Sequence, residues 1–321
     1  MIKVLTTGAL NTVQDLGRFG FLSLGVAQSG AMDSQSLAIG NILLGNAPSC
    51  SGLEIAMYPF KIKFLDSHVF SVVGAHCRMN LAGLPVPPQW ICHARPGETL
   101  VLEAPAKGVR SYICFAGGLD VPLAMGSRST DLKSALGGIE GRGLKRGDTL
   151  AVLATDTVPI KGGACAPSSV SLGAAEVRVT AASEHGEFDS HMAAMFFGSD
   201  WQVTQESNRM GIRLAGPSIT PHRKIEMLSH GILPGTVQVP PSGQPIVQMA
   251  DANTCGGYPK IANVIDADIG RLAQLPVGAS FRFVKVTHGE ALQAQIKIED
   301  ALDRLRNTVA AGDNAIRKFE G

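Results

Sequence analysis

The chain has 321 residues, and this length predicts two domains or one large one. Hydrophobic residues make up 45% and charged residues 17%, which is enough apolar material for a packed core and too little charge for a disordered chain. The formal net charge is +1, from 28 basic and 27 acidic side chains, so we expect no nucleic-acid partner, because proteins that bind a phosphate backbone are usually more basic.

The expected helices are few. Asp33 is expected to cap a helix over 34–44, and a short helix is expected over 266–272. The clearest helix follows Thr287, which with Glu290 matches a capping box. Its apolar stripe predicts one buried face, and we expect the end to fray from Gly312; the stripe consists of Leu292, Ile296, Leu302, Leu305 and Val309.

Strand signals are more common than helix signals. With 37 glycines, 18 prolines and 5% aromatic residues, the chain favours many short strands joined by turns. Short segments rich in β-branched or aromatic residues, bounded by turn residues, predict strands at 68–73, 111–115, 149–153 and 245–249. Short strands at such spacing are typical of barrels and sandwiches.

Residues 155–175 predict a linker, because they are small, polar and interrupted by proline and glycine. The two halves share an acid-x-x-Arg-x-Gly motif, starting at Asp15 and at Glu206, and later a proline-glycine turn followed by a strand. Two similar motifs that occur in the same order in both halves indicate an internal duplication of the chain. We therefore expect a domain over 1–154, the linker, a domain over 176–290, and a helix with a tail over 291–321.

The N-terminus and the cysteines indicate a cytoplasmic protein without a membrane partner. The first residues are typical of a strand entering a turn, and no long apolar segment predicts a signal peptide or a spanning helix. The six cysteines are scattered, with no C-x-x-C pair. We therefore expect reduced, partly buried thiols rather than disulfides.

Common catalytic signatures are absent from the sequence, including the P-loop, the dinucleotide fingerprint, the nucleophile elbow and His-Glu-x-x-His. A His/acid cluster over 184–189 is either a solvated turn or part of a metal site with ligands from elsewhere. Lys133 follows Thr130 at the spacing of S-x-x-K enzymes, but the companion motifs are missing.

Three polar clusters remain as candidate sites. In the first, Arg18 either holds a carboxylate or phosphate, oriented by Asp15, or pairs with Asp15 to pin a turn. Ser29 and Asp33 begin a helix whose amide groups either bind an anion or are simply capped. The second cluster holds Arg128, Ser129, Thr130 and Lys133 before the glycine-rich segment 137–142, and is either an oxyanion site or a solvated loop.

The third cluster, over 235–260, is the densest. Gln238, Gln248 and Asp251 flank apolar strand positions, and polar strand residues are costly to bury unless they are paired. Thr254, Tyr258 and Lys260 surround a Gly-Gly turn that lets a ligand approach the backbone. We therefore predict that part of this segment faces a ligand cleft.

These segments resemble the biotin-dependent carboxyltransferase family, also called the allophanate hydrolase subunit 2 family. The resemblance covers residues 3–295 and includes T-V-Q-D-L-G-R-x-G at 12–20, S-G-A-M-D at 29–33, G-S-R-S-T-D-L-K at 126–133, S-N-R-M-G-I-R-L at 207–214 and D-A-N-T-C-G-G-Y-P-K-I at 251–261. Within the family, G-G-I-E-G-R at 137–142 and L-S-H-G-I-L-P-G at 228–235 are most similar to the bacterial 5-oxoprolinase C subunits.

The resemblance implies a mainly β fold of two tandem cyclophilin-like β-barrel domains. It also implies that the chain is one component of an ATP-dependent 5-oxoprolinase, which opens 5-oxo-L-proline to L-glutamate and is inactive without the B and A subunits. ATP and Mg²⁺ would be bound together with these partners, and the B subunit would bind this chain directly.

The resemblance also suggests roles for the clusters. Arg18, Arg128, Lys133, Arg209 and Lys260 would stabilise charge on the reacting carbonyl and phosphoryl groups, and Asp15, Asp33 and Asp251 would orient these cations or bind Mg²⁺. The expected catalytic residues are Asp15, Arg18, Arg209, Asp251 and Lys260. The expected substrate- or nucleotide-binding residues are Ser29, Asp33, Arg128, Ser129, Thr130, Lys133, Gln238, Thr254 and Tyr258, and no resident metal is expected.

Some positions depart from the family pattern. Ala182 and Ser183 replace a common Gly-Pro before Glu184, and Asn253 and Cys255 replace a larger polar residue and a Thr or Ser. No Met-Lys-Met hairpin is present, so we expect no attached biotin.

Two alternatives for the function stay open. One is a carboxyltransferase component acting on urea or a related amide with a separate biotin carrier, and the other is a regulatory protein that antagonises a kinase inhibitor.

Overall fold

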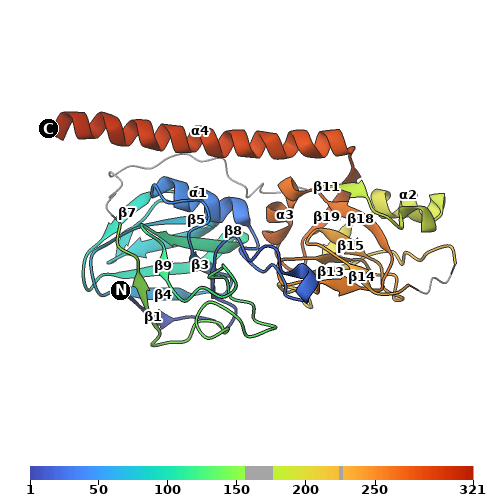
Figure 1. Ribbon diagram of the computed structural model, residues 1–321, viewed down its shortest axis with the longest axis horizontal. Coiled ribbons are helices and arrows are strands. Elements are labelled where there is room, and N and C mark those ends of the chain that lie inside the picture. The colour runs from blue at the N-terminus through green and yellow to red at the C-terminus, as the bar shows by residue number, and fades with distance from the viewer. Residues whose placement is uncertain (156–175, 224–226, 321) are drawn as a thin grey trace. The chain divides into compact units, whose positions relative to one another are not determined.

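The computed structural model describes residues 1–155, 176–223 and 227–320, with side chains as far as residue 312. The chain divides into two compact units (Figure 1). Unit 1 comprises Met1–Arg18, Ser29–Val170 and Glu299–Gly321, and unit 2 comprises Phe19–Gln28 and Ser171–Ile298. Compared with the expected domains, a short N-terminal segment joins unit 2 and the end of the chain joins unit 1. Nearly all of the predicted linker lies outside the described residues.

Unit 1 contains a ten-stranded sheet. Its strands are β1 (Ile2–Thr6), β2 (Thr12–Gln14), β3 (Gly52–Ile55), β4 (Phe60–Phe64), β5 (His68–Leu81), β6 (Leu84–Pro85), β7 (Ile91–Ala94), β8 (Thr99–Phe115), β9 (Leu119–Asp120) and β10 (Thr149–Val152). The hydrogen-bonded path runs β2-β3-β8-β4-β1-β10-β9, and β5 pairs with β6, β7 and β8.

The sheet follows from alternation along its strands. In β4, Phe60, Ile62 and Phe64 are fully buried, whereas Lys61 and Lys63 between them are partly exposed. Successive side chains of a strand point to opposite faces, so this pattern fixes which face enters the core.

One helix, α1 (Ser34–Leu43), covers β5 and β8 (Figure 1). Asp33 caps it as predicted, accepting a hydrogen bond of 3.0 Å from the Ser36 amide. Gly40 allows the close approach, since a Cβ at this position would lie 2.7 Å from the Cys114 sulfur. The helix therefore buries its apolar face against the sheet.

Unit 2 contains a closed barrel and a separate two-stranded ribbon. The barrel order is β11 (Glu176–Ala181), β18 (Lys260–Val264), β15 (Thr236–Gln238), β16 (Ile246–Gln248), β13 (Gly211–Ala215), β12 (Trp201–Val203) and β19 (Ser280–Lys285). The ribbon pairs β14 (His230–Gly231) with β17 (Cys255–Gly256). Aromatic side chains fill one part of the core, where Phe196 stacks on Phe283 at a centroid distance of 4.6 Å.

Three further helices complete the described structure: α2 (Ser190–Gly198), α3 (Asp266–Ala273) and α4 (His288–Glu320). The capping box at the start of α4 is confirmed, because the Thr287 amide donates to Glu290 at 2.7 Å and the Glu290 amide donates to Thr287 at 3.2 Å. The helix continues through Gly312, contrary to the expected fraying. Its first turns pack on Ile265 and Ala267, and Leu305 packs on the core under α1.

The expectation of a mainly β chain with few helices is confirmed. The four predicted strands and the three predicted helices are present, with ends shifted by a few residues or, for 68–73 and 111–115, as parts of longer strands. Helix α2 was missed, because its nine residues are apolar with little periodicity.

The described cysteines are free thiols. No helix in the described ranges is long and apolar enough to cross a membrane.

Candidate functional site

In unit 1, the sequence-predicted residues meet in a loop cluster around Asp15, directly after β2. The Asp15 carboxylate accepts hydrogen bonds from the Gly17 amide at 2.7 Å, the Ser127 hydroxyl at 2.7 Å and the Arg128 amide at 2.6 Å, and also from the Ser129 hydroxyl. Asp15 is nearly buried. Four donors from its own chain occupy this carboxylate, so its role in the described structure is to hold the 127–129 loop.

The basic residues of the cluster also bind this loop. The buried Arg18 donates from Nη2 to the Ser129 carbonyl, and Arg128 donates from Nε to the Val121 carbonyl at 3.0 Å. The Thr130 hydroxyl donates to the Val13 carbonyl at 3.0 Å. Lys133 is exposed. Asp15 and Arg18 therefore each hold the 127–129 loop through separate hydrogen bonds.

Ser29 and Asp33 belong to the turn that leads into α1. Ser29 is 4% exposed, has a φ of 53°, and its hydroxyl has no hydrogen-bond partner among the described residues. Gly30 is required here, since its φ is 93° and a Cβ would lie 2.8 Å from the Gly17 nitrogen. Asp33 acts as a helix cap, and its side chain accepts from both the amide and the hydroxyl of Ser36.

A buried network that no sequence motif predicted supports the same turn. Glu54 on β3 accepts 2.8 Å hydrogen bonds from the Met32 amide and the Tyr112 hydroxyl, and the Asp33 amide donates to that hydroxyl at 2.8 Å. Burial, and secondly the charge of Glu54, raises the pKa of Tyr112 well above its ordinary value. Tyr112 therefore stays protonated and remains a donor to Glu54.

In unit 2, Arg209 and Asp251 form a buried ion pair. The guanidinium donates two hydrogen bonds to the carboxylate, at 2.8 and 2.9 Å, and the Asp251 amide donates to the Arg209 carbonyl at 2.9 Å. The side chains are 7% and 2% exposed. Such a two-pronged pair joins the Arg209 turn to the segment after β16.

Lys260 contacts a different carboxylate, that of Glu184. Its ammonium group is 3.7 Å from the Glu184 carboxylate, and its amide donates to the same carboxylate at 3.1 Å. Thr254 accepts a backbone hydrogen bond from Ile232 at 3.0 Å. Glu184, which was expected in an altered turn, therefore anchors the start of β18.

One candidate ligand site is a cavity of about 190 Å³ in unit 2, which we call the amide pocket. It contains Gln238 and Tyr258 from the predicted site and Gln248 from the third sequence cluster, together with an arginine and other side-chain amides that were not assigned to a site. Its lining residues are Asn208, Met210, Gly211, Arg213, Ile232, Gln238, Ile246, Gln248, Asn253, Cys255, Gly256, Gly257 and Tyr258.

Strand register explains why these residues meet. Arg213 on β13 lies opposite Ile246 on β16, and Gly211 lies opposite Gln248. Val247 between them faces the barrel core, so these neighbours point outward. A Cβ at Gly256 in the ribbon would lie 2.6 Å from Nε2 of Gln238, so the glycine allows this side chain to keep its position.

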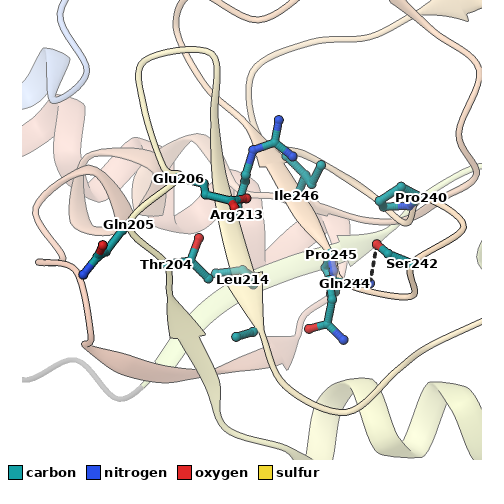
Figure 2. A pocket seen from close by; sticks show the side chains of 11 residues that line it. Thr204, Gln205, Glu206, Arg213, Leu214, Pro240, Ser242, Gln244, Pro245 and Ile246 are labelled. Carbon is teal, nitrogen blue, oxygen red and sulfur yellow. Dashed lines mark hydrogen bonds between the residues drawn. The ribbon is translucent and has the colours of Figure 1, made fainter.

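A second, larger hollow of about 550 Å³ lies beside the amide pocket (Figure 2). Arg213 and Ile246 line both cavities and lie next to each other in Figure 2. Its other labelled residues include polar side chains such as Gln205, Glu206 and Gln244, two prolines and the buried Leu214. The outward strand face at Arg213 therefore forms a wall shared by the two cavities.

The three aspartates considered for Mg²⁺ do not fit a metal site in this chain. Asp15 and Asp33 are bonded to amides and hydroxyls, and Asp251 is bonded to Arg209. Within the described ranges, no three His, Cys, Asp or Glu side chains come together as metal ligands. Any Mg²⁺ in the reaction would need ligands from outside this set.

Comparison with known proteins places the chain among carboxyltransferase domains. The family described as carboxyltransferase domain, subdomain A and B, matches residues 24–285. The chain is 42% identical over 297 residues to the C subunit of 5-oxoprolinase from Escherichia coli (strain K12), covering 92% of this chain and 94% of that protein. It is 41% identical over 309 residues to the C subunit of 5-oxoprolinase from Haemophilus influenzae, covering 96% and 99%.

Among solved structures, the crystal structure of K. lactis urea amidolyase is similar, with a TM-score of 0.88 and 28% identity. The match covers 95% of this chain but 20% of that one, so the chain spans about a fifth of the length of that relative.

Proposed function

We propose a function for this chain, which belongs to the family of the carboxyltransferase domain, subdomain A and B. The proposed function is that of one subunit of a 5-oxoprolinase, which opens 5-oxo-L-proline to L-glutamate with hydrolysis of ATP. The observation that supports this most strongly is the identity of 41–42% to two 5-oxoprolinase C subunits over nearly the whole chain. We further propose that it acts only together with the B and A subunits, in the cytoplasm.

Within this complex, we assign to this chain the binding and orientation of the lactam. A lactam carbonyl is a poor electrophile, so the reaction needs donors and cations placed around the carbonyl as charge develops. The amide pocket offers such groups. ATP and Mg²⁺ are assigned to sites that involve the partner subunits, because the aspartates of this chain are engaged by their own neighbours.

The second candidate is a carboxyltransferase that acts on urea. The similarity to urea amidolyase, with a TM-score of 0.88, supports this reading at the level of the fold. The identity to that protein is 28%, against 42% and 41% for the oxoprolinase subunits. The departures at Asn253 and Cys255 lie in the amide pocket, and therefore bear on the substrate.

A substrate comparison separates the two candidates. The chain is assembled with its cognate A and B subunits and given ATP, Mg²⁺ and either 5-oxoproline or urea. We expect ADP release with 5-oxoproline, accompanied by an equal amount of glutamate. ADP release that instead depends on urea and on a biotinylated protein would support the second candidate.

A further inference from the structure

The amide pocket presents a hydrogen-bond acceptor whose direction is set by a chain of contacts. The Tyr258 carbonyl can only accept, so the group that Gln238 turns toward it at 3.3 Å is its NH₂ group. The Gln238 oxygen then faces Gln248, whose NH₂ group donates to it at 2.9 Å. This leaves the side-chain oxygen of Gln248, which has no partner among the described residues, as an acceptor in the pocket.

A side-chain donor lies in the same cavity. The Asn208 oxygen accepts a 2.8 Å hydrogen bond from the Met210 amide, which turns the Asn208 NH₂ group away from this turn. That NH₂ group has no partner in the described part of the chain. The pocket therefore offers both an N–H donor and a carbonyl acceptor.

Arg213 gives the pocket its charge. It is the one charged side chain among the thirteen lining residues, and within the described ranges it forms no ion pair. The Arg213 side chain lies beside Ile246 on the shared wall (Figure 2). An exposed arginine on the wall of this cavity, with no ion pair among the described residues, suits an anionic ligand that can accept two parallel hydrogen bonds.

We infer that the amide pocket recognises 5-oxoproline as a lactam that carries a carboxylate. Arg213 binds the carboxylate, the Gln248 oxygen accepts from the lactam N–H, and the Asn208 NH₂ group donates to the lactam carbonyl. The cavity of about 190 Å³ suits one small ring. Urea has no carboxylate and would leave Arg213 unpaired. This inference rests on the proposed function and specifies the substrate contacts within it.

The test uses the complete complex of the chain with its partner subunits. Arg213→Met is expected to raise KM for 5-oxoproline by about 10–100-fold, because it removes a charged hydrogen-bonding partner. Arg213→Lys should have an intermediate KM, since it keeps the charge and loses the planar fork. The inhibition constant of 2-pyrrolidinone, the same lactam without a carboxylate, should stay unchanged in both variants.

Arg282→Met is the matched control. Arg282 is an exposed arginine on β19 of the same barrel, paired with Asp200 at 2.6 Å and outside the pocket. Its replacement should leave KM unchanged. An unchanged KM in Arg213→Met, with turnover of 5-oxoproline by the wild-type complex, would overturn the inference and leave the proposed function intact.

Equilibrium dialysis of labelled 5-oxoproline against the same complexes measures binding without turnover. Binding that is lost in Arg213→Met and kept in Arg282→Met would support the inference even if the complex does not hydrolyse this compound, a result that would defeat the proposed function alone. Absence of binding to the wild-type complex would overturn the inference.

Discussion

At the scale of single residues, the contacts separate side chains that hold the fold from side chains that face a ligand. Asp15, Asp33 and Asp251 have the residue type of catalytic or metal-binding groups, yet each carboxylate is bonded to donors of its own chain. In the amide pocket, Asn208, Gln248 and Arg213 each keep a side-chain donor or acceptor that has no partner among the described residues. The sequence placed Gln248 in a polar cluster and placed Asn208 and Arg213 in the 207–214 motif, but it could not show that they meet, because their proximity depends on strand pairing.

Replacing Asp251 tests whether the ion pair between Arg209 and Asp251 stabilises the fold. Asp251→Ala leaves the Arg209 guanidinium buried without this carboxylate, which should cost about 3–5 kcal/mol of unfolding free energy. Urea unfolding followed by circular dichroism measures this loss. The double variant Arg209→Met/Asp251→Leu should recover part of it, since it removes the buried charge. Loss of turnover with unchanged unfolding would instead make Asp251 a catalytic residue.

Gln248 tests the acceptor in the amide pocket. Gln248→Leu keeps the approximate volume and removes the oxygen, so KM for 5-oxoproline should rise by about 10-fold, the value of one hydrogen bond. Gln202, an exposed amide on β12 outside the pocket, provides the control as Gln202→Leu. Equal KM values in the two variants and the wild type would contradict the assignment of Gln248.

At the scale of elements, alternation and capping made most of the fold predictable. The strand at 111–115, the Asp33 cap of α1 and the capping box of α4 depend on neighbours in the sequence, and all three are present. The amide pocket depends instead on the register between β13 and β16 and on the position of the β14–β17 ribbon. These are long-range pairings, so the sequence assigned Gln238 and Tyr258 to the site and placed Gln248 in the same cluster, but gave Arg213 no role in it.

The ribbon offers a matched pair of glycine variants. Gly256→Ala would place a Cβ 2.6 Å from Gln238, whose side chain must move and so release Gln248. Gly231→Ala on the paired strand meets nothing within 4 Å. We expect KM for 5-oxoproline to rise several-fold in Gly256→Ala, with a melting temperature close to that of Gly231→Ala. A rise of similar size in both variants would show that the ribbon, rather than Gln238, determines the effect.

At the scale of the whole molecule, each unit has its own core and its own polar anchors. Nearly all of the predicted linker lies outside the described residues. Phe19–Gln28, inside the first expected domain, belongs to unit 2, and Glu299–Gly321, from the expected helix and tail, belongs to unit 1. Composition and repeats indicate that there are two β units, but not which short segments join each of them, because that depends on packing.

One buried anchor, Asp268 in unit 2, predicts how stability changes with pH. Burial by itself raises the pKa of Asp268, but hydrogen bonds from Arg178 and the charge of Arg271 outweigh it and lower the pKa below its usual value. Because the pKa is lowered in the folded state, this carboxylate stabilises the fold at pH values above its unfolded pKa of about 3.9. The contribution is lost as the pH falls through the pKa of the folded state.

Asp268→Asn should therefore lower the melting temperature at pH 7 and have a smaller effect near the acid end of the stable range. Thermal unfolding at a series of pH values measures this difference. Asp303→Asn, which breaks an exposed pair with Arg306 on α4, should have little effect at any pH. A stability difference for Asp268→Asn that does not shrink on acidification would contradict the lowered pKa.

The most direct test of the proposed function is the release of glutamate and ADP by the assembled complex when single components are omitted. The chain, its cognate A and B subunits, 5-oxoproline, ATP and Mg²⁺ are mixed, and each is left out in turn. We expect glutamate and ADP in equal amounts, and no glutamate when this chain is absent. A well-formed complex of all three subunits that releases no glutamate, or that releases it equally without this chain, would contradict the proposal and favour a different amide substrate or a regulatory role.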